Sequence, residues 1–326
     1  MTERPERSTK KTSRLGLYFM PAVFVVVAIA VSIGWMVATR YADAAFDHWL
    51  ANETLAGRQW NCATRNMAGF PFRIELSCDG LTLSTSKGDI RSLSVGGFLA
   101  VAQFYQPSQM LVETRGPFTA TLVNGQTING QWAMMRSSLH FETPNRADRV
   151  DWVVDGLVTE SSFLPVSGKV GHAEFHMRTL PNADGGPADA EFVASLADAF
   201  LKNIETPVAF DGHILVKKAA IFLETPGQFG VETWRGAGGE VNLQQWDIKR
   251  GEQSLSLTGT LSIDDTHHLA GKLDVAAKNI GDALKDTSLG AMGGILGSGS
   301  VKLPLTLAKG RVLVGPLKLA EFPPLY

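Results

Sequence analysis

The chain has 326 residues, of which 44% are hydrophobic, and it carries a formal net charge of −2. This length fits one large domain or two modest ones, and the hydrophobic fraction suffices for a core but excludes a protein with many membrane spans. The near-neutral charge excludes a general attraction to nucleic acid or to anionic lipid. With 33 glycines and 15 prolines between short apolar runs, the composition favours a β-rich fold with many turns.

The first predicted element is a membrane-spanning helix over residues 15–39, which contain no charged side chain. A helix of this length extends about 37 Å, more than the roughly 30 Å hydrocarbon core of a bilayer. Basic residues in the preceding tail, residues 1–14, place the N-terminus in the cytoplasm, so the chain beyond the span is expected to be exported. The alternative is a signal peptide cleaved near Ala42–Ala44, although the apolar stretch is longer than signal peptides use.

A second helix is predicted over residues 41–58, where Phe46, Trp49, Leu50 and Leu55 share a stripe. It either continues the span or packs on the sheet that follows. From residue 60 the apolar period changes to two, which is typical of strands. Phe72, Ile74, Leu76 and Cys78 share one strand face, and turns are predicted at Asp79–Gly80 and at Asn124–Gly125.

The chain contains only two cysteines, Cys62 and Cys78. In an oxidising exported compartment such a pair predicts a disulfide, and closing a loop of this length stabilises the fold by about 3 kcal/mol. Two buried free thiols, or a metal or redox pair, are the alternatives. The spacing matches neither a Cys-x-x-Cys motif nor a common zinc pattern.

Farther along, a loop-like stretch over residues 180–189 separates two β-rich parts, predicted as residues 41–180 and 187–326. The second part is expected to open with a helix over residues 187–204, because Phe192, Leu196, Phe200 and Ile204 recur at spacings of four. A shorter helix is predicted over residues 279–288.

The C-terminal part returns to the strand period. Apolar residues alternate over residues 254–265 and 268–279, and residues 301–319 predict two strands around a turn at Lys309–Gly310. Sustained alternation predicts an antiparallel sheet with one wet face and one apolar face. The fold class is therefore mostly β with a few helices: a transmembrane helix followed by a long, curved antiparallel sheet forming a groove.

The sequence contains few residues arranged for catalysis or metal binding. His172, Glu174 and His176 share one face of a predicted strand, where a metal site is conceivable, but a polar outer face with Ala173 and Phe175 pointing inward is the favoured interpretation. No motif of nucleophilic catalysis or of phosphate binding is recognisable. We therefore expect a protein that is not an enzyme, with no cofactor and no nucleic-acid partner.

Two stretches resemble known families. The first holds Trp60, Cys62, Gly69, Phe70, Pro71, Phe72 and Cys78, and it resembles the membrane-anchored exported proteins of the domain of unknown function 2125 family. That resemblance implies no biochemical role. The C-terminal third is similar to the ends of AsmA-like proteins, through Gly310, Val312, Val314, Gly315, Pro316 and Leu319. It implies an inner-membrane anchor and a β-groove that holds or passes lipids.

The apolar face of the predicted sheet must be covered by a second sheet, a helix or an acyl chain. We therefore expect a protein of envelope maintenance that binds lipid or another hydrophobic ligand. The predicted ligand-binding residues are Phe72, Ile74, Leu76, Leu255, Leu257, Leu261, Ile263, Leu273 and Val275. The alternative is a tethered structural or interaction module of an envelope protein complex.

Overall fold

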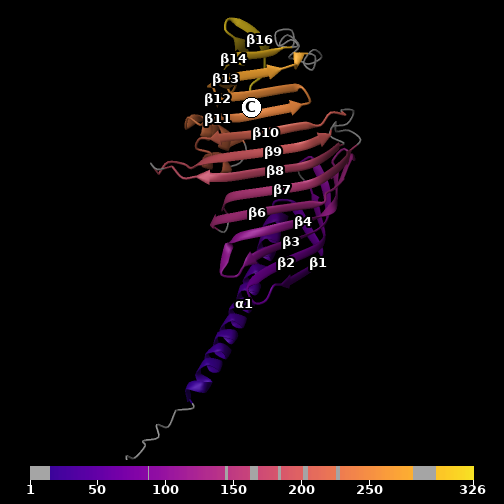
Figure 1. Ribbon diagram of the computed structural model, residues 1–326, viewed down its shortest axis with the longest axis vertical. Helices are drawn as coiled ribbons and strands as arrows, with labels where there is room; N and C mark the ends of the chain where they lie inside the picture. The colour runs from indigo at the N-terminus through magenta and orange to yellow at the C-terminus, as the bar shows by residue number, and fades with distance from the viewer. Residues whose placement is uncertain are drawn as a thin grey trace, which may run out of the picture.

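The computed structural model describes residues 15–86, 88–143, 146–161, 168–182, 185–200, 205–224, 228–281 and 299–326. It opens with one unbroken helix, α1 (Leu15–Leu55), which projects from the rest of the molecule (Figure 1). The predicted span and the predicted helix after it are therefore a single helix. Its first half exposes large apolar side chains from Tyr18 to Val37, as expected of a segment long and apolar enough to cross a membrane.

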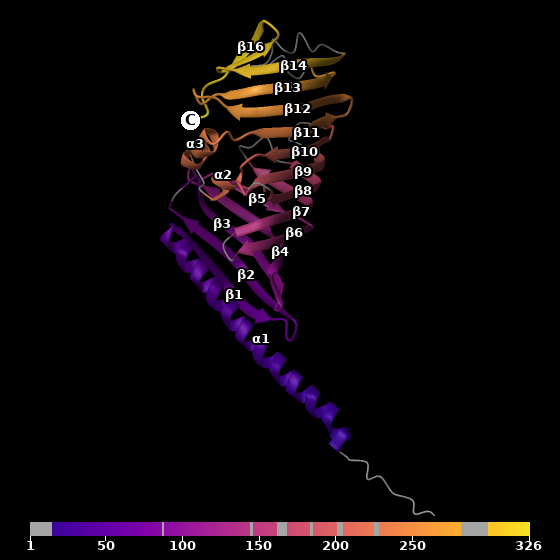
Figure 2. The ribbon, with the colours of Figure 1, turned by 90° about the vertical axis from the view of Figure 1, so that its left-hand side faces the viewer.

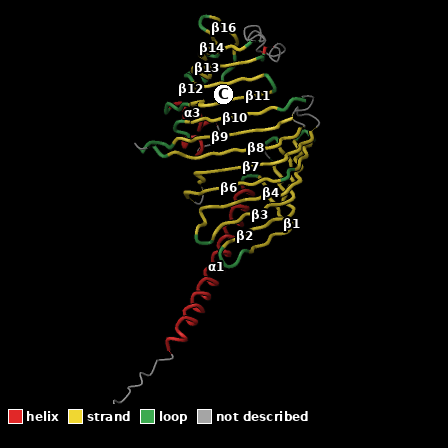
Figure 3. The backbone as a smooth tube through the Cα atoms, viewed as in Figure 1, coloured by secondary structure: helices red, strands yellow, loops and turns green. Residues whose placement is uncertain are grey.

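A single antiparallel sheet of sixteen strands follows α1. The strands lie one above another along the long axis in a twisted, curved layer (Figures 1 and 3), which confirms the predicted fold class. They are β1 (Arg58–Ala68), β2 (Arg73–Thr85), β3 (Ile90–Gln103), β4 (Gln106–Leu122), β5 (Thr127–Gln131), β6 (Met134–Thr143), β7 (Arg146–Ser161), β8 (Gly168–Leu180), β9 (Asp189–Phe200), β10 (Val208–Val216), β11 (Val241–Arg250), β12 (Gln253–Ile263), β13 (Leu269–Lys278), β14 (Ser300–Ala308), β15 (Arg311–Val314) and β16 (Leu317–Glu321).

Neighbouring strands in the sheet are also neighbours in the chain, apart from β5 and β6, which share the space between β4 and β7. Two short helices, α2 (Ala220–Glu224) and α3 (Gln228–Gly236), lie between β10 and β11 in sequence. Figure 2 shows them on one side of the sheet, while α1 runs alongside β1.

The predicted helix over residues 187–204 is wrong, because residues 189–200 form β9. A spacing of four is also a multiple of the strand period of two, so Phe192 and Leu196 share a strand face as readily as a helix stripe. β9 pairs along its length with both β8 and β10, and these backbone hydrogen bonds decide the conformation. The pairing of β8 with β9 also makes the sheet continuous on both sides of residues 181–188, of which 183–184 lie outside the described residues. Residues 201–204 and 282–288, the latter most of the other predicted helix, lie outside the described residues.

The turn predicted at Asp79–Gly80 is wrong as well, since both residues lie inside β2, which pairs with β1 on one side and β3 on the other. Gly80 has a φ of 66°, so it bends the strand without ending it. The turns at Asn124–Gly125 and Lys309–Gly310 are confirmed. The second is followed by two strands, β15 and β16, so the predicted pair of C-terminal strands is in fact three.

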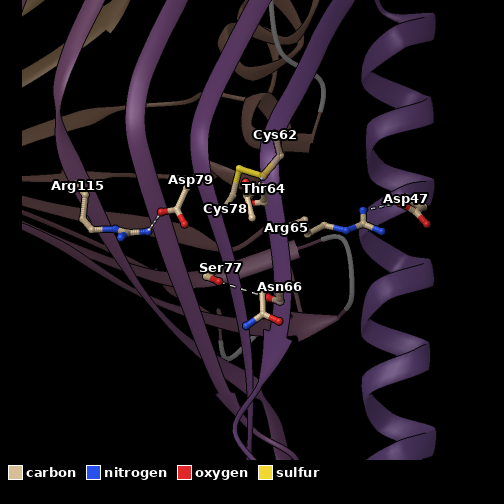
Figure 4. Close-up of a disulfide and its surroundings, with 9 residues drawn as sticks. All are labelled: Asp47, Cys62, Thr64, Arg65, Asn66, Ser77, Cys78, Asp79 and Arg115. Carbon is tan, nitrogen blue, oxygen red and sulfur yellow. Dashed lines mark hydrogen bonds and ion pairs between the residues drawn. A yellow bond between two sulfur atoms is a disulfide. The ribbon is translucent and has the colours of Figure 1, made fainter.

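The predicted disulfide is present between Cys62 of β1 and Cys78 of β2, with an S–S distance of 2.07 Å (Figure 4). Cys78 is completely buried. Beside it, Arg65 extends from β1 to α1, where it forms an ion pair with Asp47 at 2.6 Å and another with Asp43 at 2.9 Å. The disulfide holds β1 to β2, and this arginine holds the second half of α1 against β1.

Glycines in β12 and β13 allow the two strands to approach closely. Gly259 and Gly271 have φ values of 142° and 145°, and a Cβ on Gly271 would lie 2.1 Å from the carbonyl oxygen of Thr260. These glycines therefore allow the close pairing and twist of the two strands. A side chain at either position must push the neighbouring backbone away.

We expect Gly271→Ala to lower the free energy of unfolding by about 1–3 kcal/mol, because alanine strains the positive φ and clashes with fixed backbone. Urea unfolding of the full chain in detergent, followed by circular dichroism, measures the change. Gly236→Ala is the matched control, since no heavy atom lies within 4 Å of the added Cβ. Equal stability of the two variants would contradict the close approach.

Candidate functional site

One face of the sheet carries an unbroken line of apolar residues. In an antiparallel pair, two residues directly opposite each other project to the same face. Following such pairs from β2 through β3, β4 and β6 to β14 gives one register line that contains only apolar residues. We call it the apolar row: Ile74, Ala102, Met110, Leu139, Val150, Met177, Phe192, Ile214, Leu243, Gly259, Leu273 and Leu305.

The helices that the structure describes cover only part of this face. Leu305 is buried, whereas the other members of the apolar row are half-buried. At β9 to β11, Phe192 and Ile214 pack in a cluster with Trp234 of α3 and with Ala219 and Phe222 next to it. The short helices therefore form a lid over the middle of the row.

The C-terminal end of the row belongs to a separate cluster around Val275, Ala277 and Leu305. Within the described part of the chain, the residues packed against this cluster come from the sheet itself and from Ile280, directly after β13. They are Leu255, Leu257, Leu273, Ile280, Val301, Leu303, Val312, Val314 and Leu319. Apolar side chains thus stand side by side on one layer of strands without a described helix above them.

The structure brings most of the predicted ligand-binding residues together. Leu255, Leu257, Leu273 and Val275 belong to the C-terminal cluster, and Ile263 packs with the cluster under α3. Leu261 lies opposite Gly271 and Val241 on the same face.

The remaining predicted residues lie at the other end of the sheet. Ile74 begins the apolar row, and Leu76 projects to the same face two residues later. The strands between β2 and β12 fill the long sequence gap between these residues, and none of their residues was predicted to bind ligand. Phe72 is different, because it precedes β2 in a turn and is 63% exposed.

The residues of the sequence motif lie in β1, in β2 and in the turn between these two strands. Trp60 in β1 faces α1, where its ring lies 5.8 Å from that of Trp49 and its indole N–H donates to Glu53 at 3.0 Å. The two cysteines of the motif form the disulfide between β1 and β2, and its glycine, proline and two phenylalanines lie in the turn between these strands. Gly69 has a φ of 101° there, and a Cβ on it would lie 2.6 Å from the carbonyl oxygen of Arg73. The turn consists of Gly69, Phe70, Pro71 and Phe72.

The opposite face of the sheet is polar at β7 and β8. His172 contacts Asp155 at 2.5 Å through Nδ1 and Glu174 at 2.8 Å through Nε2. His176 contacts Asp151 at 2.8 Å and the second oxygen of Glu174 at 3.2 Å. Carboxylates and imidazoles therefore alternate along this face. In the part of the chain that is described, no group of three or more such side chains is arranged to hold a metal ion.

These contacts raise the pKa of His172 above its ordinary value of 6.5, chiefly through the hydrogen bond to Asp155 and then through that to Glu174. A raised pKa in the folded state stabilises the fold below pH 6.5, and this contribution disappears as the pH rises through the raised pKa. We expect Asp155→Asn to lower the pKa of His172. Histidine NMR titrations measure it, with Asp274→Asn on β13 as the control. An unchanged pKa in the first variant would contradict the contact.

The fold and the apolar row define a class: a protein with one N-terminal helix fit to anchor it in a membrane, followed by a large antiparallel sheet with an apolar face. The chain belongs to the DUF2125 family, described as uncharacterized proteins conserved in bacteria, whose sequence pattern matches residues 35–323. No curated protein and no solved structure matches the chain. The likeness of its C-terminal third to AsmA-like proteins stays a prediction.

Proposed function

We propose that this protein binds phospholipid or another hydrophobic ligand along the apolar row and serves envelope maintenance without catalysing a reaction. In this proposal α1 anchors it in the bacterial inner membrane, with the N-terminus in the cytoplasm and the sheet in the periplasm. The observation that supports the proposal is the apolar row itself, which continues without a polar member from Ile74 to Leu305.

The dimensions of the row suit acyl chains. Adjacent strands are about 4.8 Å apart, so a line across the strands from β2 to β14 has a contour of roughly 50 Å. An acyl chain that leaves water for such a surface gains about 0.8 kcal/mol per buried methylene group. Leucines such as Leu257 and Leu273 are half-buried and keep part of that apolar surface exposed in the described structure.

The proposed location is supported by two features of the chain. Residues 1–14 hold five Lys and Arg against two acidic residues, which favours retention of this end in the cytoplasm. The disulfide between Cys62 and Cys78 lies beyond the span, where an oxidising periplasm allows it to persist.

Photo-crosslinking tests the proposal on the full-length chain in its native membrane. We expect p-benzoylphenylalanine in place of Leu273, on the apolar face, to form adducts whose mass identifies phospholipid. The same amino acid in place of Lys272 is the matched control, because this neighbour is exposed on the opposite face. Mass spectrometry of the purified, illuminated protein gives the readout.

Two outcomes would overturn the proposal. Absence of lipid adducts at position 273, or equal yields at positions 272 and 273, would show that the apolar face does not select lipid. Adducts to a defined protein at position 273 would instead support a scaffold in an envelope complex.

A further inference from the structure

The lower end of the sheet exposes aromatic side chains. In the turn between β1 and β2, Phe70 and Phe72 are 58% and 63% exposed. The turn between β3 and β4 lies beside it, because the backbone N–H of Phe104 donates to the carbonyl oxygen of Phe72 at 3.2 Å. Tyr105 in that second turn is 64% exposed, and its ring lies 5.6 Å from that of Phe104. We call these four residues the aromatic tip.

The aromatic tip is in contact with the candidate membrane span. The ring of Phe70 meets Trp35 of α1 edge-on, with centroids 5.4 Å apart. The indole N–H of Trp35 also donates to the carbonyl oxygen of Arg73 at 2.8 Å, directly after the turn. These contacts fix the position of the aromatic tip along the axis of α1, at the level of Trp35.

The position of Trp35 along α1 matches the distance from Leu15 to the opposite surface of the hydrocarbon core. The helix from Leu15 to Trp35 is about 30 Å long, which equals the usual thickness of the hydrocarbon core. A span that begins at Leu15 therefore brings Trp35 and the adjoining tip to the opposite membrane–water interface. Tryptophan and tyrosine concentrate at this level because their rings are apolar and their polar atoms remain hydrated.

We propose that the aromatic tip inserts into the interfacial layer of the membrane that α1 crosses. Figure 2 shows the β1–β2 turn at the end of the sheet nearest the first half of α1, which continues beyond it. Lipid that surrounds α1 up to Trp35 also reaches Phe70, since the two rings touch. Arg73 lies beside the tip at the level of the lipid headgroups; its side chain is 62% exposed and forms an ion pair with Glu75 at 2.6 Å.

Insertion of the tip gives the domain a defined orientation on the bilayer. Two independent points, the span and the tip, then contact the membrane, so the sheet cannot swing freely about α1. The apolar row starts at Ile74, two residues after Phe72, and its first member therefore lies at the membrane surface. The inference concerns the tip alone and holds whether or not the row binds lipid.

Fluorescence of labelled full-length protein in vesicles tests the insertion. The native cysteines form a disulfide, so a single introduced cysteine accepts an environment-sensitive fluorophore. We use Phe72→Cys and Tyr105→Cys, with Phe229→Cys on α3 as the control because Phe229 is 77% exposed away from the tip. The vesicles contain phosphatidylcholine, phosphatidylglycerol and a lipid with a nitroxide near its headgroup.

We expect blue-shifted emission at positions 72 and 105, and nitroxide quenching about twofold or more above that at position 229, since only the tip shares the interfacial layer with the quencher. Quenching at both positions no stronger than at position 229 overturns the inference. A blue shift without nitroxide quenching assigns the tip to a protein partner or a second copy and also overturns it. If Phe72→Cys does not fold, the result at position 105 tests the inference alone, because Tyr105 lies in a turn outside the sequence motif.

Discussion

Replacing Trp234 by alanine is expected to lower the free energy of unfolding by about 3–5 kcal/mol, the usual cost of emptying a buried site of this size. Trp234 is 5% exposed, and its ring lies edge-on against Phe222 with centroids 5.9 Å apart. Its indole N–H donates to the carbonyl oxygen of Lys217 at 2.6 Å. The ring packs against Gly239, where there is no side chain; a Cβ on this residue would lie only 2.1 Å from Cε2 of Trp234.

The substitution of Trp234 is expected to loosen α2 and α3, which cover the middle of the apolar row. Without Trp234, the short helices lose the residue that packs them over Phe192 and Ile214, and we expect hydrogen exchange to accelerate in α2 and α3. Urea unfolding of the full chain in detergent gives the overall change. Phe229→Ala is the matched control on the same helix, and its exposed ring predicts a change within about 0.5 kcal/mol. Similar losses in the two variants would refute the packing role.

Removal of the disulfide is expected to cost about 3 kcal/mol, because the bond closes a loop of about 15 residues in the unfolded chain. We expect the double variant Cys62→Ala/Cys78→Ala to unfold at lower urea than the oxidised protein. Hydrogen exchange should accelerate in β1, β2 and the second half of α1, which the bond and Arg65 hold together. The distant strands β12 to β14 should exchange at unchanged rates.

A reductant provides the control for this variant. It should shift the native protein to the stability of the double variant and leave the double variant unchanged. Native protein that shows two titratable thiols after reduction but keeps its full stability would contradict the prediction.

Local chemistry made several parts of this protein predictable. A long uncharged stretch can satisfy its backbone in a bilayer only as a helix, so composition was sufficient to predict the span over residues 15–39. The alternation of Leu255, Leu257, Leu273 and Val275 indicated strands, because only a period of two places these residues on one face. The Asn124–Gly125 turn was predictable because both residues tolerate a positive φ.

The errors arose where local patterns are ambiguous. Phe192 and Leu196 satisfy both periods, and pairing with β8 and β10 decided for a strand. Asp79–Gly80 has the composition of a turn, but β1 and β3 pair with β2 on both sides of it, so the chain bends at Gly80 and the strand continues. In both places the deciding hydrogen bonds come from other strands, and a local window of sequence does not contain them.

The sequence by itself determined the apolar N-terminal helix, the disulfide partners and the strand-rich class. It also placed most apolar residues on one face of their own strand. Only the tertiary structure decided that these faces join into one apolar row and that the aromatic tip lies against Trp35. The physical reason is register: a slip of one residue turns a whole strand to its other face. Continuity of the row therefore depends on every strand pair at once, which the order of residues within any single strand does not specify.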